Sequence, residues 1–370
     1  MRDIPLYKPH IPSGASVLIE QVLQSGNLAG DGNLPEFEEK LRRFLGTPYL
    51  ALTAEFSRSI EMALRMAGVG PGDSVLVPAL ACLASTTPIL QTGARLIWCD
   101  IDPTTGNLDP AEIEVRRQDN TKAILFYHWV GFPGDLLRVL RIARETGLKL
   151  IEDAGEALGA ELEGKRLGAH GCDYTVFSFS PVRHITTGEG AAITFRDADQ
   201  PALAARWRRY GIPATGFRDS LGELNGACDI TVPGLQNYMN RIAGALGSKQ
   251  MDDLPGIVDV HRRNGRFFDE GLSGIDGIRL LRKTQQSIPS YWVYSFLCER
   301  RDDLLEKLRQ NRIYASKVHM RNDSYSCFGT GPVKLEGVAR FEREQLSIPC
   351  GWWVTEEDCE QILETIRNGW

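Results

Sequence analysis

Residues 177–195 read FSFSPVRHITTGEGAAITF, and this stretch decides how the middle of the chain is interpreted. FSF is typical of a buried strand that runs into a loop, TTGEG is a glycine turn, and AAITF is typical of a second strand. Arg183 stands in the loop between the two strands. The question is what a guanidinium does at the end of a buried strand.

Apolar strands and amphipathic helices alternate on the N-terminal side of this stretch. Helices are expected over 35–46, 57–68 and 136–147, the last capped by Asp135 and stopped at Gly147. Strands are expected over 48–53, 74–79, 94–101, 121–130, 148–155, 173–180 and 190–195. Alternation of this kind with continuous apolar strands predicts an α/β fold whose largely parallel sheet is covered on both faces.

The pattern changes from about residue 240. One long helix or two are expected first, followed by a strand over 291–299, a helix over 301–312 and a last helix over 355–370. This change predicts a large domain over 1–250, which includes an N-terminal arm, and a small C-terminal α+β domain over 251–370.

The composition of the chain limits the classes of partner and the cell compartment that we expect for the protein. The net charge of −6 argues against nucleic acid or an anionic membrane as the main partner. The eight cysteines are scattered without metal-ligand spacing, which indicates reduced thiols and predicts no metal site. MRDIPLYKPHIPSG has no apolar run of the kind found in signal peptides, and AILFYHWVGF is about half of the ~20 residues that a membrane helix needs. We therefore expect a cytoplasmic protein.

Ligands of parallel sheets bind where the strands end. The predicted strands end in TAEFS, PALAC, HWVG, EDAGE and FSPVRH. These five segments are the candidate site.

Motifs along nearly the whole chain resemble the DegT/DnrJ/EryC1/StrS sugar aminotransferase family. They are IPLYKPHI, GVGPGDSVLVPAL, ARLIWCDIDPTTGNLDP, HWVGFPGD, IEDAGEALGAELEGKRLGAHG, FSF followed by ITTGEGAAITF, and LSIPCGWWVTEEDCEQI. The resemblance implies an aspartate-aminotransferase-like fold (PLP-dependent transferase fold type I) with a mostly parallel seven-stranded sheet. It also implies a homodimer, a small-molecule substrate such as a nucleotide-linked keto sugar, and pyridoxal phosphate (PLP) as the cofactor.

The resemblance assigns Asp153 to the cofactor's pyridine nitrogen and Arg183 to the position of the lysine that holds PLP. Arginine cannot replace that lysine, because reaching its neutral form at pH 7 costs at least ~7 kcal/mol. Lys165 lies in an outlying turn. Some members are sugar 3-dehydratases with histidine at the lysine position, so His184, one residue further on, is a candidate catalytic base. The alternative is a packed histidine, since adjacent residues of an extended segment point in opposite directions.

The family's ring platform and phosphate cup are altered as well. Cys82 stands at the platform position, either as a reactive thiol or as a small buried filler. The phosphate run reads TAEFSR over 53–58, where Phe56 replaces a glycine and Glu55 adds a charge that repels a phosphate by ~4 kcal/mol at ~4 Å. Ser57 and Ser178 keep hydroxyls at positions that bind phosphate in the family. QNYMNR over 236–241 also departs from the family pattern.

We expect the Arg183 guanidinium to occupy the vacated cofactor space and to pair with Asp153, Glu156 or both, because buried carboxylates need a cation or a proton. In the family a glutamine or histidine stands at the position of Glu156. The alternative is that Arg183 points to solvent.

Three further residues are candidate substrate contacts, namely His128, Trp129 and His319, with core packing as the alternative for the first two. Three functions remain open. In the first, the chain is a degenerate relative that forms no internal aldimine and works without PLP. In the second, it is a lysine-free enzyme that uses PLP or its amine form, pyridoxamine phosphate (PMP), in a 3-dehydratase-like reaction. In the third, it is a non-catalytic subunit that pairs with an active paralogue.

Overall fold

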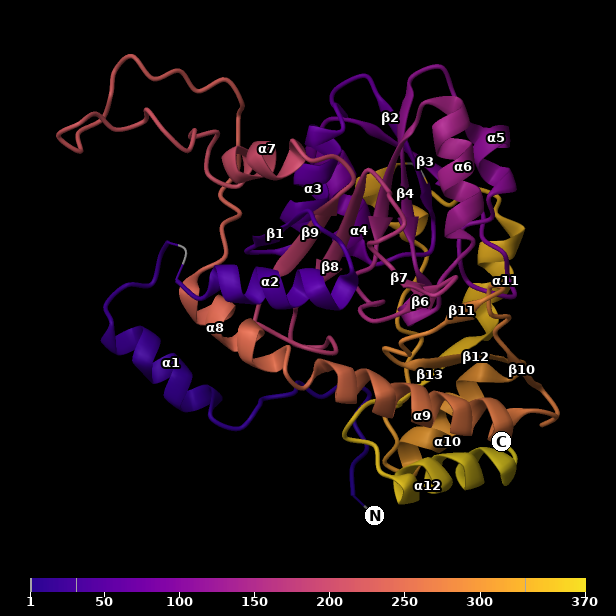
Figure 1. Cartoon of the computed structure of the whole chain (residues 1–370). Helices are drawn as coiled ribbons and strands as arrows, with labels where there is room; N and C mark the ends of the chain where they lie inside the picture. Colours follow the sequence, from indigo (N-terminus) through magenta and orange to yellow (C-terminus); the bar gives the residue numbers. More distant parts are fainter. Residues whose placement is uncertain (1, 31, 330) are drawn as a thin grey trace.

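A seven-stranded sheet forms the centre of the molecule in the computed structural model, which describes residues 2–30, 32–329 and 331–370 (Figure 1). Its strand order is β1-β9-β8-β5-β4-β2-β3. The strands are β1 (Leu50–Thr53), β2 (Ser74–Pro78), β3 (Arg95–Cys99), β4 (Thr121–Tyr127), β5 (Lys149–Asp153), β8 (Tyr174–Ser178) and β9 (Ala191–Phe195). Only β9 runs antiparallel to its neighbours, so the predicted largely parallel sheet is confirmed.

Helices cover both faces of this sheet. On one face α3 (Phe56–Met66) and α4 (Leu83–Gln91) bury side chains such as Ile60 with Leu125 of β4. On the other face α2 (Leu34–Leu45) and α6 (Leu136–Thr146) bury side chains such as Leu41 with Phe126. Successive residues of β4 therefore point to opposite faces, as the continuous apolar strands predict.

The C-terminal third is built around a second sheet of three antiparallel strands, β10 (Ile278–Leu280), β12 (Tyr294–Cys298) and β13 (Gln345–Ile348). Helices α9 (Leu254–Leu272), α10 (Arg301–Gln310), α11 (Glu336–Glu344) and α12 (Glu356–Arg367) accompany it (Figure 1). A small sheet of β6 (Glu161–Leu162), β7 (Lys165–Arg166) and β11 (Ser287–Ile288) joins residues from both halves of the sequence. The remaining elements are α1 (Ala15–Gln24), α5 (Ala111–Arg116), α7 (Gln200–Trp207), α8 (Arg241–Gln250), η1 (Trp129–Gly131), η2 (Asn322–Ser324) and η3 (Ser326–Phe328).

Most of the expected elements are present, with their ends shifted by a few residues. The predicted cap of α6 is confirmed, since the Asp135 carboxylate accepts the amide of Arg138 at 3.4 Å and Gly147 ends the helix with φ 71°. The predicted strand over 291–299 begins only at Tyr294, because Tyr291 adopts φ 48°. The domain boundary near residue 250 stays a prediction.

Two segments stand away from the sheet in Figure 1. Helix α1 lies to one side beyond α2 and α8, and the chain between α7 and α8 extends outward as a long loop. Within the described residues, no helix combines the length and the apolar character needed to cross a bilayer.

Candidate functional site

The carboxyl ends of three neighbouring parallel strands bring a buried ionic cluster together around Glu156. Its Oε1 lies 3.2 Å from Nη1 of Arg183 and 2.9 Å from Nε2 of His319, and the hydroxyl of Tyr127 donates to its Oε2. The Glu156 side chain is only 1% exposed. Burial by itself would raise the pKa of this carboxyl, but His319 and Arg183 hold the pKa below its ordinary value.

Arg183 points inward from the loop after β8, and its side chain is 9% exposed. Its guanidinium carbon lies 4.4 Å from the ring centroid of Trp292, whose indole N–H donates to the Val182 carbonyl at 2.5 Å. Within the described residues its Nε has no hydrogen-bond partner. The expected ion pair with Glu156 is therefore confirmed, and the alternative of an arginine that points to solvent is wrong.

The expected contact between Arg183 and Asp153 is not among the ion pairs of the described residues. Asp153 instead accepts the hydroxyl of Ser85 at 2.5 Å and the amide of Gly155 at 3.0 Å. Burial raises the pKa of Asp153 to about 6, and the neighbouring Glu156 adds to the rise. The pKa values of these two buried carboxyls are therefore shifted in opposite directions, upward for Asp153 and downward for Glu156.

His184 turns away from this cluster, in agreement with the packing alternative. It is 2% exposed, and its Nε2 lies 3.1 Å from the Ser290 carbonyl. Its ring lies 4.6 Å from that of His261, whose Nδ1 bonds the Tyr291 carbonyl at 2.7 Å. Desolvation places the pKa of both imidazoles below the ordinary value, to about 4 for His261. The prediction of His184 as a catalytic base has no geometric support here.

Of the three candidate substrate contacts, His319 is the one that bonds Glu156, whereas Trp129 packs edge-on against the rings of Tyr127 and His319. His128 is fully buried, with Nε2 3.0 Å from Glu152 and Nδ1 accepting the Gly134 amide at 3.1 Å. Trp129 is also fully buried, and its indole N–H donates to Ser295 at 3.2 Å. His128 and Trp129 are packing residues in this structure.

Two aromatic residues that the sequence reasoning missed complete the cluster. Tyr7, from the N-terminal segment, stacks on Trp292 with 4.8 Å between ring centroids, and the pKa of its phenol is raised by burial and by Glu156. The only sequence signal for Tyr7 was its place in IPLYKPHI, one of the stretches that carried the family resemblance. Trp292 had been predicted inside a strand.

Cys82 and Ser178 lie close to the strand ends without contacting Glu156. Cys82 precedes the first turn of α4, and burial raises the pKa of its thiol to about 11, which fits a filler rather than a reactive thiol. The Ser178 hydroxyl is buried at the end of β8 and accepts the amide of Ser180 at 3.4 Å.

The N-terminus of α3, where the resemblance places the cofactor's phosphate, is capped by a side chain of the protein. The Glu55 carboxylate accepts the amides of Ser57 at 2.8 Å and Arg58 at 2.7 Å, and the Ser57 hydroxyl at 2.7 Å. Phe56 follows as the first residue of the helix and is buried. The sequence reasoning expected Glu55 to repel a phosphate, whereas the structure shows it binding the groups that would hold one.

These residues do not fit PLP held in the usual way. An internal aldimine needs an amine at the strand end, and Arg183 supplies a guanidinium that is paired with Glu156. Lys165 was expected in an outlying turn and lies instead in the short strand β7. What the cluster offers instead is a carboxylate–imidazole pair, Glu156 and His319, that can hold or move a proton. Among the described residues no group of three or more His, Cys, Asp or Glu side chains is arranged to hold a metal ion.

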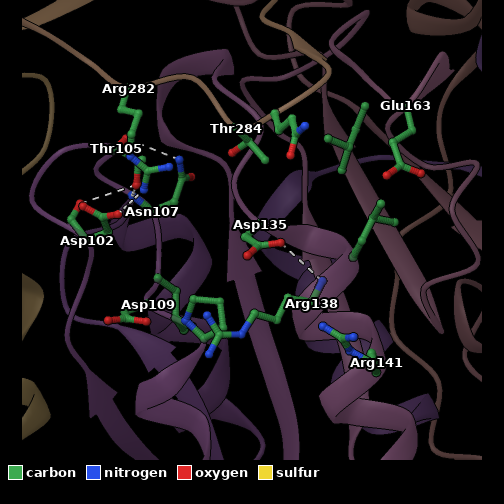
Figure 2. A pocket seen from close by; sticks show the side chains of 15 residues that line it. Asp102, Thr105, Asn107, Asp109, Asp135, Arg138, Arg141, Glu163, Arg282 and Thr284 are labelled. Carbon is green, nitrogen blue, oxygen red and sulfur yellow. Dashed lines mark hydrogen bonds and ion pairs between the residues drawn. The ribbon is translucent and has the colours of Figure 1, made fainter.

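A cavity of about 590 Å³ lies elsewhere, between the turn after β3, the start of α6 and the segment around Thr284 (Figure 2). Its walls carry both signs of charge, with Asp102, Asp109, Asp135 and Glu163 facing Arg138, Arg141 and Arg282 (Figure 2). None of the sequence-predicted site residues lines it.

The fold and the strand-end site define the aspartate-aminotransferase-like scaffold of PLP-dependent transferases. Two solved structures share it over almost their full lengths. They are the sugar aminotransferase CalS13 from Micromonospora echinospora (30% identity, TM-score 0.94, 99% of this chain and 100% of that chain) and AtS13 from Actinomadura melliaura (33% identity, TM-score 0.93, 100% of each). Residues 14–367 match the DegT/DnrJ/EryC1/StrS aminotransferase family, and the chain belongs to this family. A GDP-perosamine synthase from Caulobacter vibrioides is 37% identical over 90% of this chain and 88% of its own length.

Proposed function

We propose that this chain is a member of its family that forms no internal aldimine, is not an ordinary transaminase, and works without PLP on a small molecule in sugar or secondary-metabolite biosynthesis. The observation that carries the proposal is the Arg183–Glu156 ion pair, buried at the strand end that the family uses for its lysine. An arginine so held cannot act as a nucleophilic amine near neutral pH.

The class of substrate follows from the relatives. Their names include a GDP-perosamine synthase and a dTDP-4-dehydro-2,3,6-trideoxy-D-glucose 4-aminotransferase, so a nucleotide-linked sugar is the first class to test. In this proposal Glu156 and His319 are the proton-handling pair, and Arg183 keeps Glu156 ionised. His319, at 13% side-chain exposure, is the member of that pair more open to solvent.

The decisive experiment is an absorbance titration of the purified protein with PLP and, separately, with PMP. The GDP-perosamine synthase of Caulobacter vibrioides serves as the control. We expect no saturable, borohydride-trappable adduct and no amino transfer to nucleotide-linked keto sugars. A yellow, borohydride-trappable complex that transfers amino groups would refute the proposal.

A second candidate is a lysine-free enzyme that uses PLP or PMP, as the histidine-bearing dehydratases do. Retention of Asp153, buried and bonded to Ser85 at 2.5 Å, favours it, because a carboxyl at this place can meet a pyridine nitrogen. Saturable PMP binding without a covalent adduct, together with dehydration of a keto sugar, would support this candidate over the first.

We also propose a homodimer, and a cytoplasmic location. Apolar side chains exposed on α1, such as Val17 and Leu23, and on the loop before α8, such as Leu221 and Leu224, support an interface there. Light scattering on the chain expressed alone measures the assembly. A monomer that dimerises only with a lysine-bearing paralogue would favour the third candidate, a non-catalytic subunit.

A further inference from the structure

The carboxylate that caps α3 bonds more of the groups at the helix N-terminus than an ordinary capping side chain does. Helix N-termini bind anions because their first amides have no partner within the helix and the helix dipole favours negative charge there. Both oxygens of the Glu55 carboxylate are engaged, one with the Ser57 amide and the other with the Arg58 amide and the Ser57 hydroxyl. Glu55 thus supplies the anion that this terminus would otherwise take from solution.

Glu55 is held in this position from a distant part of the chain. The side-chain oxygen of Asn237 accepts the amide of Ala54 at 3.1 Å and the amide of Glu55 at 3.0 Å, and Asn237 is fully buried. The backbone that carries the carboxylate is therefore fixed on both sides of the turn. This contact argues against a mobile surface glutamate.

The next residue, Phe56, packs against Gly155 just beyond the end of β5. Ring atoms of Phe56 lie 2.9 Å from the position that a Cβ on Gly155 would take, and Oδ1 of Asp153 lies 3.1 Å from the same position. The phenyl ring and the Asp153 carboxylate therefore lie on the same side of Gly155. Phe56 is 6% exposed, so it is a fixed part of the interior.

Charges of both signs act near the start of α3. Burial raises the pKa of Glu189, the Glu55 charge raises it further, and the Arg183 charge lowers it in part. The engaged Glu55 carboxylate, and not the overall field, is therefore what occupies this helix terminus.

We infer that Glu55 and Phe56 fill the anion and ring subsites of the family's cofactor site with the protein's own atoms. The carboxylate stands in for the phosphate on the amides of α3, and the phenyl ring stands in for the pyridine ring beside Asp153. The site is closed by a built-in substitute, which makes PLP, PMP and other phosphorylated pyridines poor ligands. This inference rests on the proposed function and adds a physical reason for it that is independent of Arg183.

The test is a gain of binding. PMP is the probe, because it has no aldehyde and cannot react with surface lysines. Equilibrium dialysis compares the wild type with Glu55→Ser/Phe56→Gly, in which serine still caps the helix and glycine removes the ring. The wild type should show no saturable PMP binding at millimolar concentrations. The double variant should bind PMP at least about tenfold more tightly, the scale of a favourable anion–helix interaction.

Two single variants separate the subsites. Glu55→Ser should improve binding of PMP and leave binding of unphosphorylated pyridoxamine unchanged, whereas Phe56→Ala should improve binding of both. The matched control is Asp135→Ser, which also replaces an acidic helix cap by serine, at the start of α6, and should not alter PMP binding. If the double variant does not fold by circular dichroism, the single variants decide.

The outcomes also separate this inference from the proposed function. Folded variants that bind PMP no better than the wild type would overturn the inference and leave the proposed function intact. A wild type that binds PMP tightly would overturn the inference and favour the lysine-free cofactor enzyme. A wild type that forms a saturable, borohydride-trappable PLP complex and transfers amino groups would refute the proposed function itself.

Discussion

Replacing Arg183 with methionine tests whether the buried ion pair stabilises the fold. The side chains of Arg183 and Glu156 are 9% and 1% exposed, so removing the cation leaves a carboxylate in the interior. Breaking such a pair from one side costs 3–5 kcal/mol as a rule, and because Tyr127 and His319 still bond Glu156, we expect the lower end, about 3 kcal/mol. At ~2 cal/mol/K per residue of unfolding entropy, this lowers the melting temperature by about 4 °C.

The pH dependence gives the sharper readout. In the wild type the pKa of Glu156 is depressed, so this residue contributes stability above its unfolded pKa, and that stability is lost as the pH falls through the folded pKa. In Arg183→Met burial outweighs the remaining partners and raises this pKa. The variant should therefore lose most stability near pH 7 and approach the wild type in acid, where Glu156 is protonated.

The assay is urea denaturation followed by tryptophan fluorescence between pH 4.5 and 7.5. Arg141→Met on α6 is the matched control, because Arg141 is exposed and no described residue pairs with its side chain. Its effect should stay within about 0.5 kcal/mol. A loss in Arg183→Met that is no larger than in the control, or that does not change with pH, would refute the reasoning.

Three further outcomes follow from the same contacts. The pKa of His261 is lowered to about 4 from an unfolded value near 6.5, so folding keeps this imidazole neutral. The free energy of unfolding should therefore fall by about 1.4 kcal/mol per pH unit from this residue as the pH drops from 6 to 4.5. If His261→Asn shows the same dependence of unfolding free energy on pH as the wild type in urea denaturation, this expectation is contradicted. Arg183→Lys should give no borohydride-trappable PLP adduct at residue 183 when made alone, and should give one there when combined with Glu55→Ser/Phe56→Gly. Peptide mass spectrometry locates the adduct, and an adduct at residue 183 in the single variant would show that the subsites are open. Asn237→Ala leaves the amide of Glu55 without its acceptor and should cost about 1–3 kcal/mol in urea denaturation; a loss below 0.5 kcal/mol would mean that the amide finds another partner.

Local sequence patterns were enough for the central sheet, because continuous apolar runs bounded by Pro and Gly identify buried strands without knowledge of tertiary contacts. Helix α4 was missed because its sequence, LASTTPILQ, carries Pro88 and β-branched threonines, which disfavour a helix in isolation. Its side chains are buried against the sheet, and this packing overrides the local preference.

Some residues of the site could likewise be predicted from local sequence, whereas others could not. The pairing of Arg183 with Glu156 could be predicted, because both follow neighbouring parallel strands and two charges buried at one edge must be compensated. Tyr7 and Trp292 could not, since they come from segments that meet only when the chain has folded. The positive φ of Tyr291 also interrupts the pattern that suggested a strand through Trp292.

Charge balance is the strongest argument that these departures belong together. A PLP site presents a buried carboxylate and a helix N-terminus that normally receive a pyridinium and a phosphate. Were the site decaying at random, these groups would be left unpaired, at several kcal/mol for a buried charge. Instead the helix amides hold Glu55, and the carboxylate added at Glu156 is matched by Arg183. The helix amides and the Glu156 carboxylate are thus each satisfied by a side chain of the protein, which is the pattern expected if the site is stable without a cofactor, as proposed above.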